Sequence, residues 1–253
     1  MTRFAKALIT GASSGLGRAI ALELARRGTR TFVLIARRED LLSSLAAELR
    51  DLGTEARTIV LDVAQTDDVI RIVREEDAAC GGFDLVLANA GIGLARPMPE
   101  LEWDDLKRVL DVNTQGAIAT LFAALSPMLV RNRGTLAGMS SQASQRGLPG
   151  SGSYSASKAA LSTWLETLRL DLAESNVRVV DIRPGFVKTP MTEGAQHPQP
   201  FLVELEPAAR RCVDDLERGR PVSTFPWPMA VLIWIARRMP DGLFGVIARR
   251  WRG

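Results

Sequence analysis

The stretch LITGASSGLGRAIALELARRG, residues 8–28, has the pattern of a short apolar strand, a glycine-rich turn and an amphipathic helix. Gly11, Gly15 and Gly17 allow tight backbone geometry and the close approach of a ligand. The amino end of the following helix offers free N–H groups and the positive end of a dipole, which suits a pyrophosphate. Glycines also serve plain turns, but in this context, at the first crossover, they indicate a nucleotide site.

Short apolar runs alternate with helical patterns along the rest of the chain. The runs are rich in Val, Ile and Leu and begin at residues 4, 31, 56, 83, 134 and 177, with a weaker seventh over 219–226. Most are nearly continuous in apolar residues, as expected of strands that helices cover on both faces. The alternation predicts an α/β protein with a doubly wound, seven-stranded parallel sheet. No linker or repeat divides the chain, so we expect a single domain over residues 1–253.

Composition argues against several classes of function. The net charge is only +3, and no basic run alternates with aromatic residues, so we expect no nucleic-acid partner. Cys80 and Cys212 lack the spacing of a metal site or a redox pair, and we expect no metal. The first apolar run is too short for a signal peptide, and the apolar run at 227–236 is far shorter than a bilayer span. These features predict a cytoplasmic protein.

A single tyrosine, Tyr154, stands four residues before Lys158 in a run of small residues. Residues four apart share one face of a helix, so the two side chains are expected to project together. A free phenol has a pKa near 10, about three units too high for a base at neutral pH, and a nearby lysine cation lowers it. The pair is a candidate for proton exchange with an alcohol or a carbonyl group. The plainer interpretation is a surface pair on a helix.

The spacing TGxxxGxG of residues 10–17 resembles that of the classical short-chain dehydrogenases/reductases. Five further motifs resemble those of the family and follow in its order: NAG at 89–91, VNTQG around Asn113, SS at 140–141, YSASK at 154–158 and PGFVKT at 184–189. The resemblance implies a Rossmann-like fold and hydride transfer between a nicotinamide cofactor and a carbon bearing oxygen. The small-molecule substrate would be a ketone, an aldehyde or a secondary alcohol. A cofactor-binding regulator or scaffold with little turnover is the alternative on the same fold.

By resemblance, the catalytic residues are Asn113, Ser141, Tyr154 and Lys158. Ser141 follows the fifth apolar run, where ligands sit in parallel sheets, and its hydroxyl would bind the substrate oxygen beside Tyr154. Asn113 places an amide inside a helical pattern, where an amide is neutral to unfavourable. The resemblance makes it the residue that positions a water next to Lys158, and a polar side chain facing solvent is the alternative.

The resemblance also assigns the contacts to the cofactor. Asp62 would hold the adenine together with the Val63 backbone, although an aspartate at a strand end can instead cap the next helix. The other expected contacts are Gly11, Ser13, Ser14, Gly15, Leu16, Gly17, Asn89, Ala90, Gly91, Tyr154, Lys158, Pro184, Val187 and Thr189.

The end of the second apolar run predicts which cofactor is used. A carboxylate there would accept the ribose hydroxyls of the non-phosphorylated cofactor, and this sequence has Ala36 instead. Arg37 and Arg38 follow, and a guanidinium can bind a 2′-phosphate through paired hydrogen bonds. We therefore predict NADP(H) rather than NAD(H), with Arg37 as the main contact. The alternative is that both arginines are solvated residues at the start of the next helix.

Two later segments complete the prediction. Residues 189–207 contain four prolines and little regular pattern, which is typical of a substrate lid, and Met191, Phe201 and Leu202 in it favour an apolar substrate. Residues 226–253 form an extension that departs from the family pattern. It could pack on the domain as a helix, form a dimer surface, or rest on a membrane through an apolar face with basic flanks. The family resemblance implies a homodimer or a homotetramer.

Overall fold

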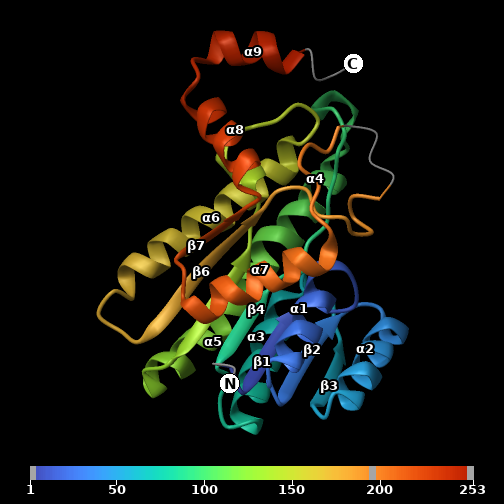
Figure 1. The fold of residues 1–253 in the computed structure, drawn as a ribbon, viewed down its shortest axis with the longest axis vertical. Helices are drawn as coiled ribbons and strands as arrows, with labels where there is room; N and C mark the ends of the chain where they lie inside the picture. The colour runs from blue at the N-terminus through green and yellow to red at the C-terminus, as the bar shows by residue number, and fades with distance from the viewer. Residues whose placement is uncertain (1–3, 194–197, 250–253) are drawn as a thin grey trace.

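The computed structural model describes residues 4–193 and 198–249, and it contains one sheet with helices along both faces (Figure 1). The seven parallel strands lie in the order β3-β2-β1-β4-β5-β6-β7. This topology confirms the predicted doubly wound, single-domain fold. Residues 194–197 of the predicted lid and residues 250–253 of the extension lie outside the described residues.

The strands correspond to the predicted apolar runs. Their bounds are β1 Lys6–Thr10, β2 Thr31–Ala36, β3 Glu55–Val60, β4 Leu85–Ala88, β5 Gly134–Met139, β6 Val177–Pro184 and β7 Val222–Phe225. The third strand ends at Val60, before its apolar run ends. Asp62 therefore lies in the loop that follows the strand and not at its end. The sheet begins with β3 at one edge and ends with β7 at the other.

Within the described residues, the helices alternate with the strands up to β7, and two more helices follow it. Their bounds are α1 Gly15–Arg26, α2 Glu39–Asp51, α3 Thr66–Ala79, α4 Trp103–Leu110, α5 Ala117–Arg131, α6 Gly152–Asp171, α7 Leu205–Arg218, α8 Trp227–Arg238 and α9 Asp241–Arg249. Two short 3₁₀ turns, η1 Met98–Glu100 and η3 Gln142–Gln145, and one π-helical turn, η2 Asp111–Gly116, lie between them. In Figure 1, α9 lies at the upper end of the molecule, beyond α8.

Two apolar layers hold the helices on the sheet. Successive residues of β1 point to opposite faces, so Ile9 belongs to one layer and Leu8 to the other. Helices α1, α2 and α7 contribute buried residues to the first layer, and α3, α5 and α6 contribute to the second. The strands inside the sheet are thus covered on both faces, whereas no residue of the edge strand β3 is buried. The carboxyl ends of the strands are left to the loops that form the site.

Candidate active site

The glycine turn after β1 is packed too tightly for any side chain at two of its positions. A Cβ at Gly11 would lie 2.6 Å from the Ala90 Cα, and a Cβ at Gly17 would lie 2.3 Å from the Asn89 amide nitrogen. Gly11 and Gly15 have φ values of +66° and +56°, which favour glycine. The turn therefore requires its glycines, as the sequence predicts.

The amino end of α1 has the properties of an anion site. Among the described residues, no side chain caps the first turn at Ser14, and no acidic residue lies in that turn. Its free N–H groups and the helix dipole favour a negatively charged ligand. A pyrophosphate fits this donor set, so the turn could hold a dinucleotide through Ser13, Ser14, Gly15, Leu16 and Gly17.

The loop after β4 is hydrogen-bonded to the glycine turn. The Asn89 side-chain amide donates to the carbonyl oxygens of Thr10 and Gly11, each at 3.1 Å. The Thr10 hydroxyl accepts from the backbone N–H groups of Asn89 and Ala90, at 3.1 and 3.2 Å. Asn89 therefore holds the two loops together through hydrogen bonds within the protein, and this role does not depend on a contact with a cofactor.

The two arginines after β2 differ in what they contact. The Arg38 guanidinium donates to the hydroxyls of Ser13 and Ser14, so it lies over the glycine turn. Arg37 is 59% exposed and lies 4.0 Å from the Asp62 carboxylate. Arg38 is therefore a candidate contact for a phosphate at the turn, in addition to the predicted Arg37. The pair of adjacent arginines was the available signal.

Asp62 is engaged by the protein itself. Its carboxylate accepts from the Arg108 guanidinium, and its Oδ1 accepts from the backbone N–H of Ala64 at 3.1 Å. Burial raises the pKa of Asp62, but hydrogen bonds from Arg108 and Ala64 and the charges of Arg108 and Arg37 outweigh burial and lower it. The Asp62 carboxylate is therefore held as an anion next to Val63 and close to Arg37.

Asn113 lies in the π-helical turn and is fully buried. Its Oδ1 accepts from the backbone N–H of Ile92 at 2.8 Å. Its Nδ2 donates to the Ile92 carbonyl at 3.0 Å and to the Ser157 hydroxyl at 3.1 Å. The solvent-facing alternative is therefore wrong, because the amide connects the loop after Gly91 to helix α6. Ser157, inside the YSASK motif, is a partner that its position alone could have suggested.

Ser141 and Tyr154 come together at the carboxyl end of β5. Ser141 caps the 3₁₀ turn η3, and its hydroxyl accepts from the backbone N–H of Ala143 at 3.1 Å. Burial raises the pKa of Tyr154, and a side-chain hydrogen bond with Ser141 partly opposes this rise. The sequence predicts a lowered pKa for Tyr154 beside Lys158. The net shift has the opposite direction in this structure, because the desolvation of the phenol dominates.

Lys158 is buried on the same helix face as Tyr154. Its Nζ lies 5.8 Å from the centre of the Tyr154 ring. Burial lowers the pKa of Lys158 to about 8, and the Asp181 carboxylate opposes that shift. A Cβ at Gly91 would lie 3.3 Å from both the Lys158 Nζ and the Asn113 Oδ1, so these two atoms flank one small space. The structure thus brings the four predicted catalytic residues to one end of the sheet.

A buried carboxylate on β6, that of Asp181, connects the end of β5 with β6 and α6 next to this arrangement. Asp181 of β6 accepts from the hydroxyls of Ser140 and Ser162 and from the Arg183 Nε, the last at 2.6 Å. Ser140 is therefore a structural serine, which agrees with the choice of Ser141 as the catalytic one. A lone aspartate in an apolar strand was the sequence signal for this cluster.

The segment after β6 crosses the glycine turn. A Cβ at Gly15 would lie 3.6 Å from the Thr189 side chain, so Thr189 covers the turn. Val187 is buried and pairs with Val203 in an isolated β-bridge, and the Lys188 N–H donates to the Val203 carbonyl at 2.9 Å. The bridge therefore closes most of the predicted lid, residues 189–207, at its base.

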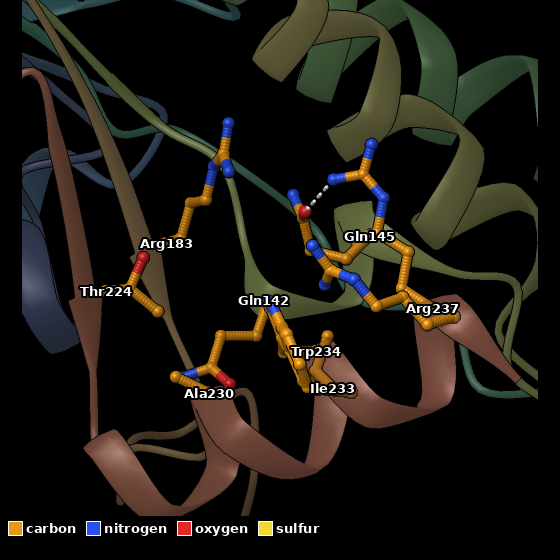
Figure 2. A pocket seen from close by; sticks show the side chains of 9 residues that line it. Gln142, Gln145, Arg183, Thr224, Ala230, Ile233, Trp234 and Arg237 are labelled. Atoms are coloured by element: carbon orange, nitrogen blue, oxygen red, sulfur yellow. Dashed lines mark hydrogen bonds between the residues drawn. The ribbon is translucent and has the colours of Figure 1, made fainter.

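A cavity of about 580 Å³ lies between η3, β6, β7 and α8 (Figure 2). Figure 2 shows Arg237 of α8 pointing toward Gln145, and its guanidinium donates to the Gln145 Oε1 at 2.9 Å. Among the described residues, the lining leaves out Tyr154 and Lys158. The cavity is therefore separate from the candidate catalytic centre.

The fold and the site together define an α/β protein with a nucleotide-type turn and a serine–tyrosine–lysine cluster at one end of a parallel sheet. The sequence profile of the family described as short chain dehydrogenase matches residues 5–200. A Myxococcus xanthus protein named "uncharacterized oxidoreductase" is 46% identical over 246 residues, which cover 97% of each chain. The chain therefore belongs to the short-chain dehydrogenase/reductase family of oxidoreductases, a family that uses nicotinamide cofactors.

Solved structures are similar over most of the chain. The alcohol dehydrogenase of the archaeon Thermococcus sibiricus, solved with 5-hydroxy-NADP, is 31% identical with a TM-score of 0.77, covering 87% of this chain and 94% of that one. A short-chain dehydrogenase/reductase of Burkholderia phymatum, solved with NAD, has a TM-score of 0.84 at 24% identity, covering 91% and 92%. The second likeness concerns the fold alone. Among the described residues, no helix is long and apolar enough to cross a membrane.

Proposed function

We propose that the chain is an NADP(H)-dependent oxidoreductase that interconverts a ketone or an aldehyde with the corresponding alcohol, with Tyr154 as general acid and base. One arrangement carries the proposal. A side-chain hydrogen bond joins Ser141 and Tyr154, and the Lys158 Nζ and the Asn113 Oδ1 flank Gly91 at the same end of the sheet. A bound nicotinamide would supply or accept the hydride, and the protein would orient the substrate and handle the proton.

In the reduction, the Tyr154 hydroxyl would donate its proton to the carbonyl oxygen, and Ser141 would donate a hydrogen bond to the same oxygen. The raised pKa of Tyr154 supports this direction, because the phenol keeps its proton at neutral pH. The Lys158 ammonium, with a pKa of about 8, would stabilise the phenolate that remains. We propose that Asn113 positions a water that returns the proton.

Cofactor choice rests on the residues after β2. Ala36 leaves no carboxylate at the strand end. The Arg38 guanidinium donates to Ser13 and Ser14 of the glycine turn, and the exposed Arg37 guanidinium lies 4.0 Å from the Asp62 carboxylate. Paired hydrogen bonds from a guanidinium suit a 2′-phosphate, which a carboxylate would repel. These features support NADP(H) over NAD(H), with Arg37 as the main contact and Arg38 as a second one.

The substrate class rests on the predicted lid. Met191, Phe201 and Leu202 are exposed there, at 51%, 48% and 45%. Leu148 and Pro149, in the segment between Ser141 and Tyr154, are half-buried. An apolar ketone, aldehyde or secondary alcohol would cover such a surface on binding. The predicted homodimer or homotetramer and the cytoplasmic location stay predictions, which sedimentation velocity and cell fractionation test.

Tyr154→Phe tests the mechanism, because it removes one hydroxyl and little volume. We expect kcat to fall by about 10²- to 10⁴-fold on a panel of apolar carbonyl compounds, while NADPH still binds by fluorescence. Ser153→Ala is the matched control on the same helix, since its buried hydroxyl has no hydrogen-bond partner among the described residues. A Tyr154→Phe variant as active as the wild type would overturn the mechanism. Wild-type protein that binds NADPH but oxidises none of it across the panel would favour the regulator instead.

A further inference from the structure

Among the described residues, helices α8 and α9 expose eight large apolar side chains, which we call the C-terminal apolar surface. Each of them is between 41% and 76% exposed. They are Trp227, Val231, Leu232, Trp234 and Ile235 of α8 and Leu243, Val246 and Ile247 of α9. An apolar surface of this kind marks a site of contact with a partner or a membrane.

Helix α8 directs most of its apolar side chains away from the domain. It is anchored by Met229 and Ile233, which are one turn apart and buried. The cavity of Figure 2 lies beside this stripe, and Ala230, Ile233 and Trp234 of α8 line it. Trp227, Val231 and Ile235 recur at intervals of four and therefore form the opposite, exposed face.

Helix α9 is held by one arginine of the segment between Ser141 and Tyr154. The Arg146 guanidinium donates to the carbonyl oxygens of Ala236 and Met239 at 2.7 and 2.9 Å, and to the Asp241 carboxylate at 2.7 Å. It also lies 4.1 Å from the centre of the Phe244 ring. These contacts fix one side of α9 to the domain, and its apolar residues at 243, 246 and 247 are exposed.

The net positive charge of the chain comes from the same segment. Residues 226–253 contain five arginines and one aspartate, a net charge of +4, whereas the whole chain carries +3. The rest of the chain therefore carries −1. Within α8, Arg237 and Arg238 follow the exposed apolar residues. The Arg238 guanidinium stacks on the Trp234 ring at 3.9 Å, whereas the Arg237 guanidinium is exposed and donates to Gln145 at the edge of the cavity.

We propose that the C-terminal apolar surface docks the protein onto a membrane surface that carries anionic lipids. Tryptophan and aliphatic side chains enter the boundary between headgroups and acyl chains, and arginines bind the anionic headgroups. Twelve residues of α8 span about 18 Å, against about 30 Å for the hydrocarbon core, so the helix would lie along the surface.

A second copy of the chain fits this surface less well. A two-fold interface would bring the same patch of both copies together, so that the arginines at 237 and 238 of both copies would gather in one interface. Like charges at a desolvated interface oppose association. An anionic membrane instead complements both the apolar face and the basic residues.

Vesicle flotation of the full-length protein tests the proposal. The probes are vesicles of phosphatidylcholine alone and vesicles with about 30% phosphatidylglycerol, each at low and high salt. We expect the protein to float with the anionic vesicles and to be released by salt. Arg237→Gln with Arg238→Gln should weaken the partition by about tenfold or more. Arg30→Gln with Arg50→Gln is the matched control, because both residues are exposed and the loss of charge is the same.

The apolar contribution is tested separately. Trp227→Ser with Leu243→Ser should also weaken the partition at least about tenfold, since both side chains would leave the boundary region. Val130→Ser with Leu170→Ser is the control, because these residues are 85% and 70% exposed elsewhere on the chain. The proposal is overturned if the wild type does not float with anionic vesicles, or if the control pairs lose as much binding as the test pairs. If the wild type forms a dimer and does not bind vesicles, and if Trp227→Ser with Leu243→Ser dissociates that dimer, the surface belongs to a contact with a second copy.

Discussion

The Nζ of Lys158 donates a hydrogen bond of 2.7 Å to the carbonyl oxygen of Met139, the last residue of β5. This bond joins helix α6 to the strand whose end leads to Ser141. The buried ammonium is therefore fixed relative to both the serine and the tyrosine. Its protonation is controlled by burial, with the Asp181 carboxylate as the nearby charge that opposes the shift.

Because the pKa of Lys158 is lowered from 10.5 to about 8, the charged form is disfavoured in the folded protein. Between these values the unfolded chain binds more protons, so the free energy of unfolding rises with pH, by about 3 kcal/mol in total. This contribution is fully present above the unfolded pKa and is lost as the pH falls through about 8. Lys158→Met should lack the rise.

Urea denaturation at about pH 7.5, 9 and 10.5 measures this difference. Other titrating groups are common to both proteins, so the wild-type value minus the Lys158→Met value isolates the lysine. The lost bond to Met139 shifts the variant by a constant amount and leaves the slope unaffected. Parallel pH profiles of the two proteins would contradict the lowered pKa.

Gly91→Ala should slow turnover without unfolding the protein. The new Cβ would lie 3.3 Å from both the Asn113 Oδ1 and the Lys158 Nζ, which is closer than an ordinary contact. Asn113 is held by its bonds to Ile92, so the shift falls on the catalytic lysine or on the space between the two. We expect kcat to fall at least about tenfold, the effect of a misplacement smaller than 1 Å. Gly242→Ala is the control, since its Cβ would meet nothing within 4 Å, and equal kcat values for the two variants would refute the argument.

Arg37→Asp should raise the Michaelis constant for NADPH at least about tenfold, because one charge-assisted bond contributes roughly 1.5–3 kcal/mol. It should affect NADH much less, because NADH lacks the 2′-phosphate. Steady-state kinetics with both cofactors, for Arg37→Asp, Arg38→Asp and the exposed control Arg30→Asp, measure the effect. Equal catalytic efficiency of the wild type with NADH and NADPH would sink the prediction. A larger effect at Arg38 than at Arg37 would transfer the main contact to the residue over Ser13 and Ser14.

The predicted lid should lose backbone mobility when cofactor and substrate bind together. Val187 and Val203 pair at its base, and the Thr192 hydroxyl donates to the Val187 carbonyl at 2.6 Å. A loop closed at its base can move as a unit about that pair. Hydrogen exchange of the amides in 188–193 and 198–203 should slow in the ternary complex, with β1 amides as the internal reference. Unchanged exchange would mean a fixed wall.

The sheet could be predicted from the sequence because each buried strand is an apolar run bounded by polar or glycine residues. The exception is instructive: β3 ends two residues before Asp62, although the apolar run continues through Val63. Val60 is 53% exposed at this edge strand, whereas Leu61 and Val63 beyond it are buried under other elements. Hydrophobicity records burial, and here burial extends past the last paired residue.

The site could be predicted at motif positions and less well at their partners. Tyr154, Lys158 and Asn113 are specified by local spacing and family pattern. Arg146 lies in an irregular segment with no period, and its acceptors are about ninety residues later in the chain, so its role emerges only in three dimensions. The choice between Arg37 and Arg38 likewise depends on the backbone direction after β2, which composition does not encode.

The π-helical turn η2 has a consequence for how this region tolerates changes in length. A π-turn holds one residue more than the α-helical turn it replaces. Deleting one residue within 111–116 would therefore convert η2 into an α-helical turn and leave α5 in nearly the same phase relative to α4. The buried Leu121 and Ala124 would stay on the sheet, whereas the amide of Asn113 would lose its position against Ile92. The extra residue thus serves the placement of one side chain, and its removal would spare the packing of the helix.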